Sequence, residues 1–187
     1  MASDTIIKDG GGSGRSMTVS AFFRGNVSAK INPRLFYASR DESKSFNSIS
    51  IATGIAAGQY PFYLKNTSPT DNLYIYRIEF HATEAVKWIV WEVTGTAAGT
   101  EVTPSNLNLG SGREAEASSY GDGVVTGLST VKRVGTHRNE AGGEGEMVFF
   151  DSLILSPGKA IAIEYDSGTT GDCEFDVLFH FETIGKK

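Results

Sequence analysis

Cysteine is almost absent from this sequence, and histidine is rare. The 187 residues contain one cysteine, Cys173, and three histidines. A single cysteine cannot close an intramolecular disulfide, and no Cys/His spacing of the zinc-binding kind occurs. Cys173 also lies in phase with the phenylalanines of its segment, so we expect a buried and unreactive thiol. The sequence therefore predicts no metal and no cofactor.

Long apolar runs and an excess of positive charge are also missing. No window approaches the roughly 18 consecutive apolar residues of a transmembrane helix. The N-terminus, MASDTIIKD, has no basic region followed by an apolar run, so we expect no signal peptide. The net charge of −5 disfavours binding to phosphate backbones. We expect no membrane partner, no nucleic-acid partner and folding in a reducing cytoplasm.

Short strands recur from about Ser45 onward. The segment CEFDVLFHFE alternates most clearly, because every second residue from Cys173 to Phe181 is apolar. The segment Ala85–Val93, AVKWIVWEV, is almost continuously apolar, as in a strand covered on both sides. Its two tryptophans, Trp88 and Trp91, have opposite phase, so one is expected in the core. About eight strands predict an all-β fold, an antiparallel β-sandwich with jelly-roll-like topology.

Two further interpretations concern the strand pattern. The segment NLYIYRIEFHA is predicted to present four side chains on one face, namely Tyr74, Tyr76, Ile78 and Phe80. Residues 94–122 are polar and glycine-rich, and are interpreted as a long loop that could bind a ligand. A second loop is expected at residues 135–146.

The first 44 residues differ from the rest, because their apolar positions are sparse and follow no sustained period. We interpret residues 1–44 as an extended Gly/Ser-rich arm and residues 45–187 as the sandwich domain. The glycines of IIKDGGGSGRSMTV do not form a phosphate-binding loop, since Asp9 replaces the first required glycine and Arg15 the lysine. They are typical of a tether. The candidate partner-binding residues are the larger apolar ones of the arm: Ile6, Ile7, Met17, Val19, Phe22 and Phe23.

Candidate catalytic and metal-binding residues are weak. His81 and His180 could approach one another in a sheet, near Glu79 and Glu182, and form a surface metal site, but solvated strand histidines are favoured. Carboxylates such as Glu144 and Glu146 could act on a sugar only at a fixed separation, which the sequence does not reveal. No G-x-S-x-G motif occurs. We assign no catalytic residue and expect a protein that is not an enzyme.

Three segments resemble a family of tailed-bacteriophage virion proteins: IIKDGGGSGRSMTVSAFFRGNVSA, QYPFYLKNTSPTDNLYIYRIEF and SLILSPGKAIAIEYD. In that family the N-terminus runs Asp-Gly-small-Gly-small-Gly, followed by an alternating strand and an Asn-rich link. A strand reading tyrosine-leucine-lysine-asparagine then leads through a polar turn to a strand of alternating aliphatics. The resemblance covers the arm and most of the sandwich. The chain departs from the pattern at FFRG, where a valine-aspartate-polar-asparagine run would be usual.

The resemblance implies a non-enzymatic structural protein of the virion, assembled in the bacterial host cytoplasm. Proteins of this kind decorate or cement the capsid and stabilise the head through arms that contact neighbouring subunits. The implied partners are the major capsid protein or other virion subunits and further copies of the chain, with a trimer favoured. The alternative is a carbohydrate- or receptor-binding module of a phage tail or fibre, with Trp88 or Trp91 and the 94–122 loop as its site.

Overall fold

The computed structural model describes residues 5–8, 16–19, 38–39 and 42–184, the first two ranges by their backbone alone. The chain divides into an N-terminal unit and a body that spans residues 33–184. In the N-terminal unit, β1 (Thr5–Lys8) and β2 (Ser16–Val19) pair antiparallel, with Ile7 opposite Met17. The predicted arm therefore contains one two-stranded sheet, whose strands flank the glycine-rich stretch.

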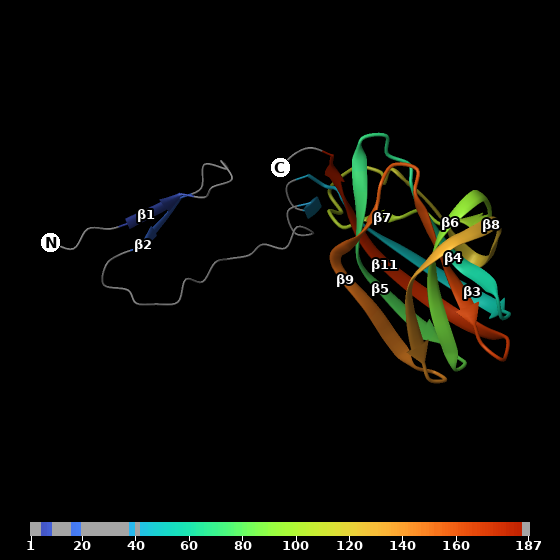
Figure 1. The fold of residues 1–187 in the computed structure, drawn as a ribbon. Coiled ribbons are helices and arrows are strands. Elements are labelled where there is room, and N and C mark those ends of the chain that lie inside the picture. Colours follow the sequence, from blue (N-terminus) through green and yellow to red (C-terminus); the bar gives the residue numbers. More distant parts are fainter. Residues whose placement is uncertain (1–4, 9–15, 20–37, 40–41, 185–187) are drawn as a thin grey trace. The chain divides into compact units, whose positions relative to one another are not determined.

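Two antiparallel sheets form the body (Figure 1). One has five strands in the order β7-β3-β11-β5-β9, and the other closes on itself in the order β10-β4-β8-β6. The strands are β3 (Ser45–Ile55), β4 (Gln59–Asn66), β5 (Asp71–Ala82), β6 (Val86–Glu101), β7 (Ser105–Asn106), β8 (Ala117–Asn139), β9 (Glu144–Leu155), β10 (Ala160–Asp166) and β11 (Gly171–Thr183). This arrangement confirms the all-β sandwich, while the jelly-roll topology stays a prediction. Among the described residues, no helix has the length and apolar character needed to span a membrane.

Aromatic side chains fill the space between the two sheets. Trp88 of β6 is fully buried and packs edge-on against Phe175 of β11, with ring centroids 5.0 Å apart. Phe80 of β5 stacks on the same indole at 5.6 Å. Burial of such large rings removes much apolar surface from water, so this cluster is the main source of folding free energy. All four strands of the closed sheet also contribute to a second, smaller cluster around Tyr63, Val93 and Val125.

The predicted long loop at residues 94–122 is wrong, because strands occupy most of it. The structure continues β6 to Glu101 and starts β8 at Ala117, and these two ends pair with one another. The second predicted loop is also shorter, since β8 runs to Asn139 and β9 begins at Glu144. The end of β6 is largely exposed on both faces, and the buried positions at the start of β8 are Ser119 and Gly121, which carry no apolar signal. A strand without a buried face needs no alternation of apolar residues, so the sequence gives no period there.

The predicted common face of Tyr74, Tyr76, Ile78 and Phe80 is also wrong. Pairing between β5 and β11 shifts register between Arg77 and Ile75, so β5 has one extra residue there. Such a bulge inverts the alternation. Ile78 and Phe80 are buried in the core, whereas Tyr74 and Tyr76 are only half-buried and out of phase with them.

Candidate interaction surface

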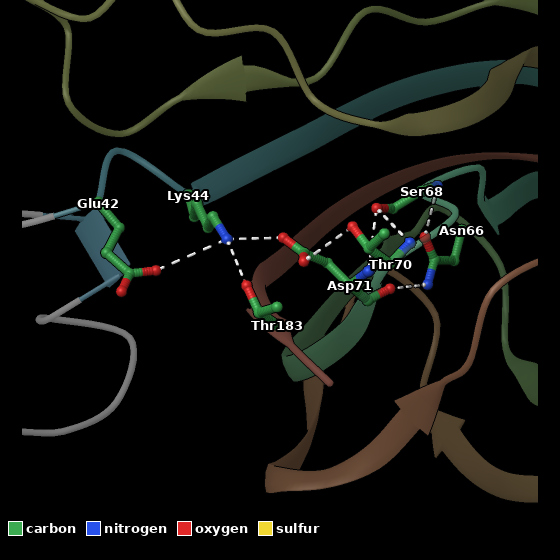
Figure 2. Close-up of polar contacts among 7 residues, drawn as sticks. All are labelled: Glu42, Lys44, Asn66, Ser68, Thr70, Asp71 and Thr183. Carbon is green, nitrogen blue, oxygen red and sulfur yellow. Dashed lines mark hydrogen bonds and ion pairs between the residues drawn. The ribbon is translucent and has the colours of Figure 1, made fainter. Parts of the chain in front are cut away.

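Lys44 stands immediately before β3. Lys44 is buried, and its ammonium group donates a hydrogen bond to Oδ2 of Asp71 at 2.6 Å and another to Oγ1 of Thr183 at 3.2 Å (Figure 2). Glu42 lies 3.7 Å from the same nitrogen. The backbone of Lys44 is also bonded, since its carbonyl accepts from the N–H of Phe181. These contacts tie the start of β3 to the beginning of β5 and the end of β11.

Asp71 is held in place by the turn between β4 and β5. The side-chain amide of Asn66 donates to the carbonyls of Asp71 and Leu155, both at 2.8 Å, and its oxygen accepts from the N–H of Ser68. The hydroxyl of Ser68 accepts from the N–H of Asp71 at 3.1 Å. Asn and Ser favour turns because their side chains can bond the nearby backbone in this way. Figure 2 shows the bonds among Asn66, Ser68 and Asp71, which continue the network that begins at Lys44.

The electrostatics of this junction favour the ionised carboxylate. Burial alone would raise the pKa of Asp71, but the hydrogen bonds from Lys44, Thr183 and Thr70 and the charge of Lys44 lower it below its ordinary value. A buried ion pair of this kind contributes most by specifying one arrangement, because either partner alone would be a buried, uncompensated charge. The network therefore fixes the start of β3 to the start of β5 and the end of β11 within the body.

A second feature is the side of the five-stranded sheet that faces away from the sandwich core. Strand register aligns eight of its side chains in two rows that cross β3, β11, β5 and β9. We call these eight residues the outer face. One row is Ile49, Asp176, Glu79 and Glu146; the other is Ile51, Glu174, His81 and Glu144.

Successive side chains of β3 point to opposite faces of the sheet. Because the serines of β3 face the interior of the sandwich, the isoleucines between and after them face solvent. Ser48 and Ser50 are buried, and the hydroxyl of Ser48 lies 2.9 Å from that of Ser119 on β8. Ser50 accepts from the N–H of Asp122 at 2.8 Å. These bonds form where β3 passes close to β8, so small polar residues are needed on that side. Ile49 and Ile51 are consequently 49% and 59% exposed.

The carboxylates of the outer face line an open cleft of about 570 Å³ together with His81 and the neighbouring Phe80 and Gly145. Glu79 lies directly opposite both Glu146 and Asp176, and like charges opposite one another destabilise a sheet. Arg77 partly offsets this repulsion, since its guanidinium lies 3.0 Å from Glu79. Among the described residues, no group of three or more His, Cys, Asp or Glu could hold a metal ion. The cleft therefore presents spread negative charge.

The predicted arm residues are only partly within the described structure. The backbones of Ile6, Ile7, Met17 and Val19 belong to β1 and β2. Phe22 and Phe23 lie outside the described residues. The role of all six in binding a partner stays a prediction.

His81 and His180 do not meet. His81 is opposite Glu174 on β11, and His180 is six residues further along that strand, which corresponds to about 20 Å. The expectation that both are solvated is wrong for His180, which is fully buried. Its ring stacks on Tyr74 with centroids 5.3 Å apart. Asp151 reaches within 3.6 Å of its Nδ1 from β9, where Phe150 and Asp151 have positive φ and interrupt the regular pairing.

Cys173 and the tryptophans agree with the sequence analysis. Cys173 is buried, and burial together with the nearby Asp172 raises the pKa of its thiol to about 12. Trp88 is the core tryptophan and is fully buried, so it cannot contact a sugar. Trp91 is half-buried; its indole N–H donates to Glu164, and the guanidinium of Arg133 lies 5.9 Å from its ring centroid. The carbohydrate-binding alternative thus retains only Trp91.

The sequence analysis did not single out the outer face as a unit. Glu79 lies in one segment of the sequence, Glu144 and Glu146 in a second, and Ile49 and Ile51 in a third. The available signal was the phase of Phe46, Ser48 and Ser50, which predicts that the isoleucines lie on the opposite face from Phe46. The association of the four strands is not visible in the sequence, because the register joins residues about 60 to 130 positions apart.

The chain matches no model of a known protein family, and no curated protein matches it significantly.

Proposed function

We propose that this chain is a non-enzymatic structural protein of a phage virion, most specifically a capsid decoration or cement protein. In this proposal its N-terminal arm contacts neighbouring subunits and stabilises the head. The partners are the major capsid protein or other virion subunits and further copies of the chain, with a trimer favoured. The protein is located in the virion.

The observation that carries the proposal is the combination of a self-contained β body with a separate N-terminal unit. The two parts also differ in charge. Residues 1–44 contain seven Lys and Arg against four Asp and Glu, a net charge of +3. Residues 45–187 contain ten against 18, a net charge of −8. A segment that carries the opposite charge to the body favours association between subunits, because each copy offers both signs.

The junction at Lys44 supports the same function. A tether that transmits a stabilising load must end at a rigid point of the body, and Lys44 is bonded through both its side chain and its backbone. The resemblance of the arm and of two body segments to phage virion proteins adds the assignment to a particle. The small residues of the arm would allow it to add a strand to a partner's sheet edge.

Electron microscopy of particles that carry the protein tests the proposal. We expect density for the sandwich on the capsid surface, and loss of that density when residues 1–44 are deleted. The control is the full-length variant Lys87→Met, which changes a partly exposed ion pair elsewhere on the body and keeps the arm. Particles without any matching density, or with undiminished density after the deletion, would contradict respectively the virion assignment and the role of the arm.

A further inference from the structure

We propose that the outer face of the five-stranded sheet binds the N-terminal arm of a second copy of this chain. The inference rests on the proposed function, in which the arm reaches a neighbouring subunit, and it adds the surface that receives the arm. Two observations carry the inference. Exposed isoleucines and opposed carboxylates lie in the same rows of the outer face. The arm has the complementary composition, with both apolar and cationic residues.

The apolar part of the outer face is formed by Ile49 and Ile51. Both lie on β3 at one end of each row, and about half of each side chain is exposed. Each isoleucine is directly opposite a carboxylate of β11, Asp176 and Glu174 respectively. A segment that binds here must therefore present apolar and cationic side chains close together.

The carboxylates of the outer face repel one another. Glu146, Glu79 and Asp176 lie side by side on three neighbouring strands. Arg77 is the cation paired with Glu79 in this region, and Asn47 donates a hydrogen bond to Asp176. Further cations placed over the cleft would relieve the repulsion. Each exposed pair contributes little by itself, about 0–1 kcal/mol, so several pairs must form at once.

The arm fits this surface by sequence. Its cations are distributed along the chain rather than clustered, and four of them adjoin large apolar residues, as in Phe22-Phe23-Arg24 and Lys30-Ile31. Neighbouring strands are about 4.8 Å apart, so the four strands of the rows span about 14 Å. An extended segment of about five residues covers that distance at about 3.3 Å per residue. A single metal ion would not cover that distance, and the described residues offer it no chelating group.

A second copy is the natural source of the arm, because the arm and the outer face are different surfaces of the same chain. An arm of one copy on the outer face of the next is a head-to-tail contact, and such contacts close into rings when the rotation between copies allows it. This geometry is consistent with the trimer of the proposed function.

Complementation between two full-length variants tests the inference. The first carries Glu146→Lys and Glu174→Lys, which reverses two exposed charges of the outer face. The second carries Arg24→Glu and Lys30→Glu in the arm. A matched control, Glu101→Lys with Glu114→Lys, makes the same change of net charge at exposed positions outside the outer face. Solution mass is measured by sedimentation at about 0.05 M and 0.5 M salt, since exposed charges are screened at the higher concentration.

We expect the wild type to associate at low salt and to dissociate at high salt. Each variant alone should associate about tenfold or more weakly than the wild type, from the loss of two pairs and the gain of repulsion. Mixing the two variants should restore association, because the arm of the first meets the intact outer face of the second, and the reversed charges of the second arm complement those of the first outer face. The control should behave as the wild type does.

A wild type that is monomeric at low salt, or an outer-face variant that associates as tightly as the control, would overturn the inference. So would a mixture of the two variants that forms no dimer, which is the result expected if each arm binds its own body. These measurements use the isolated protein and do not require assembled virions. Absence of the protein from particles would instead contradict the proposed function and leave the measured contact between copies standing.

Discussion

The ammonium nitrogen of Lys44 lies 2.6 Å from Oδ2 of Asp71, and both side chains are almost fully buried. These residues are 27 positions apart, one at the entrance to β3 and the other at the start of β5. Their contact fixes the entrance to β3 within the sandwich. It also makes the junction sensitive to the loss of either charge.

The first prediction concerns Lys44→Met. This change leaves Asp71 buried without its counter-charge, so the free energy of unfolding should fall by about 3–5 kcal/mol. Urea denaturation monitored by circular dichroism measures the loss. The control Lys87→Met removes a comparable contact to Asp166 with side chains 29% and 45% exposed, and should cost about 0–1 kcal/mol. Equal effects of the two changes would contradict a special role for the buried pair.

A double variant distinguishes the loss of the counter-charge from a general loss of folding. In Lys44→Met combined with Asp71→Leu, no unpaired charge remains, and apolar replacement of a buried pair is often neutral or stabilising. The double variant should therefore recover most of the stability lost by Lys44→Met. If it is no more stable than Lys44→Met, the loss comes from packing rather than charge.

The second prediction concerns pH. The pKa of Asp71 is lowered in the folded protein, whereas in the unfolded chain it is about 3.9. Between these two values the unfolded state binds more protons, so the contribution of Asp71 to stability rises with pH. It is complete above the unfolded value and is lost as the pH falls through the lowered folded pKa. Unfolding free energies measured from about pH 2 to 6 should rise less steeply in Asp71→Asn.

Asp166 supplies the comparison for this titration. Its carboxylate also bonds a lysine but is 45% exposed. Asp166→Asn removes a lysine-bonded carboxylate at this more exposed site and is the matched control for the change of side chain. An unchanged slope in Asp71→Asn would show that the Asp71 carboxylate is not the group that loses its stabilising contacts in acid.

The third prediction concerns Gly121. A Cβ placed there would lie 2.6 Å from Cβ and 2.3 Å from Oγ of Ser50, at the close approach of β8 to β3. Gly121→Ala should therefore destabilise the protein by about 1–3 kcal/mol, as overpacking does in other cores. The control is Gly112→Ala, where a Cβ would meet nothing within 4 Å. Thermal unfolding of both variants checks the difference, and similar midpoints would contradict the tight seam.

The fourth prediction concerns Cys173. With its pKa raised to about 12 by burial and Asp172, only about one thiol in 10⁴ is ionised at pH 8. An aromatic disulfide reagent should react slowly with the native protein and release one equivalent promptly in guanidinium chloride. Prompt release from the native protein would mean that β11 opens readily or that the thiol is accessible.

The sequence by itself determined the class of fold. Apolar residues at every second position predict β11 and its buried Cys173, because alternation is a local property of an extended chain. The opposite phase of Trp88 and Trp91 placed one of them in the core for the same reason. The difference between the first 44 residues and the rest was likewise a matter of composition.

Only the tertiary structure decided which face each irregular strand presents and which side chains meet. The bulge in β5 inverts its alternation after Tyr76, and nothing near that residue in the sequence announces it. The serines of β3 turn inward because Ser119 and Asp122 lie against them, about 70 residues away. The rows of the outer face and the pair of Lys44 with Asp71 are also contacts between distant segments. They depend on strand register and on the packing of whole sheets, which local periodicity does not encode.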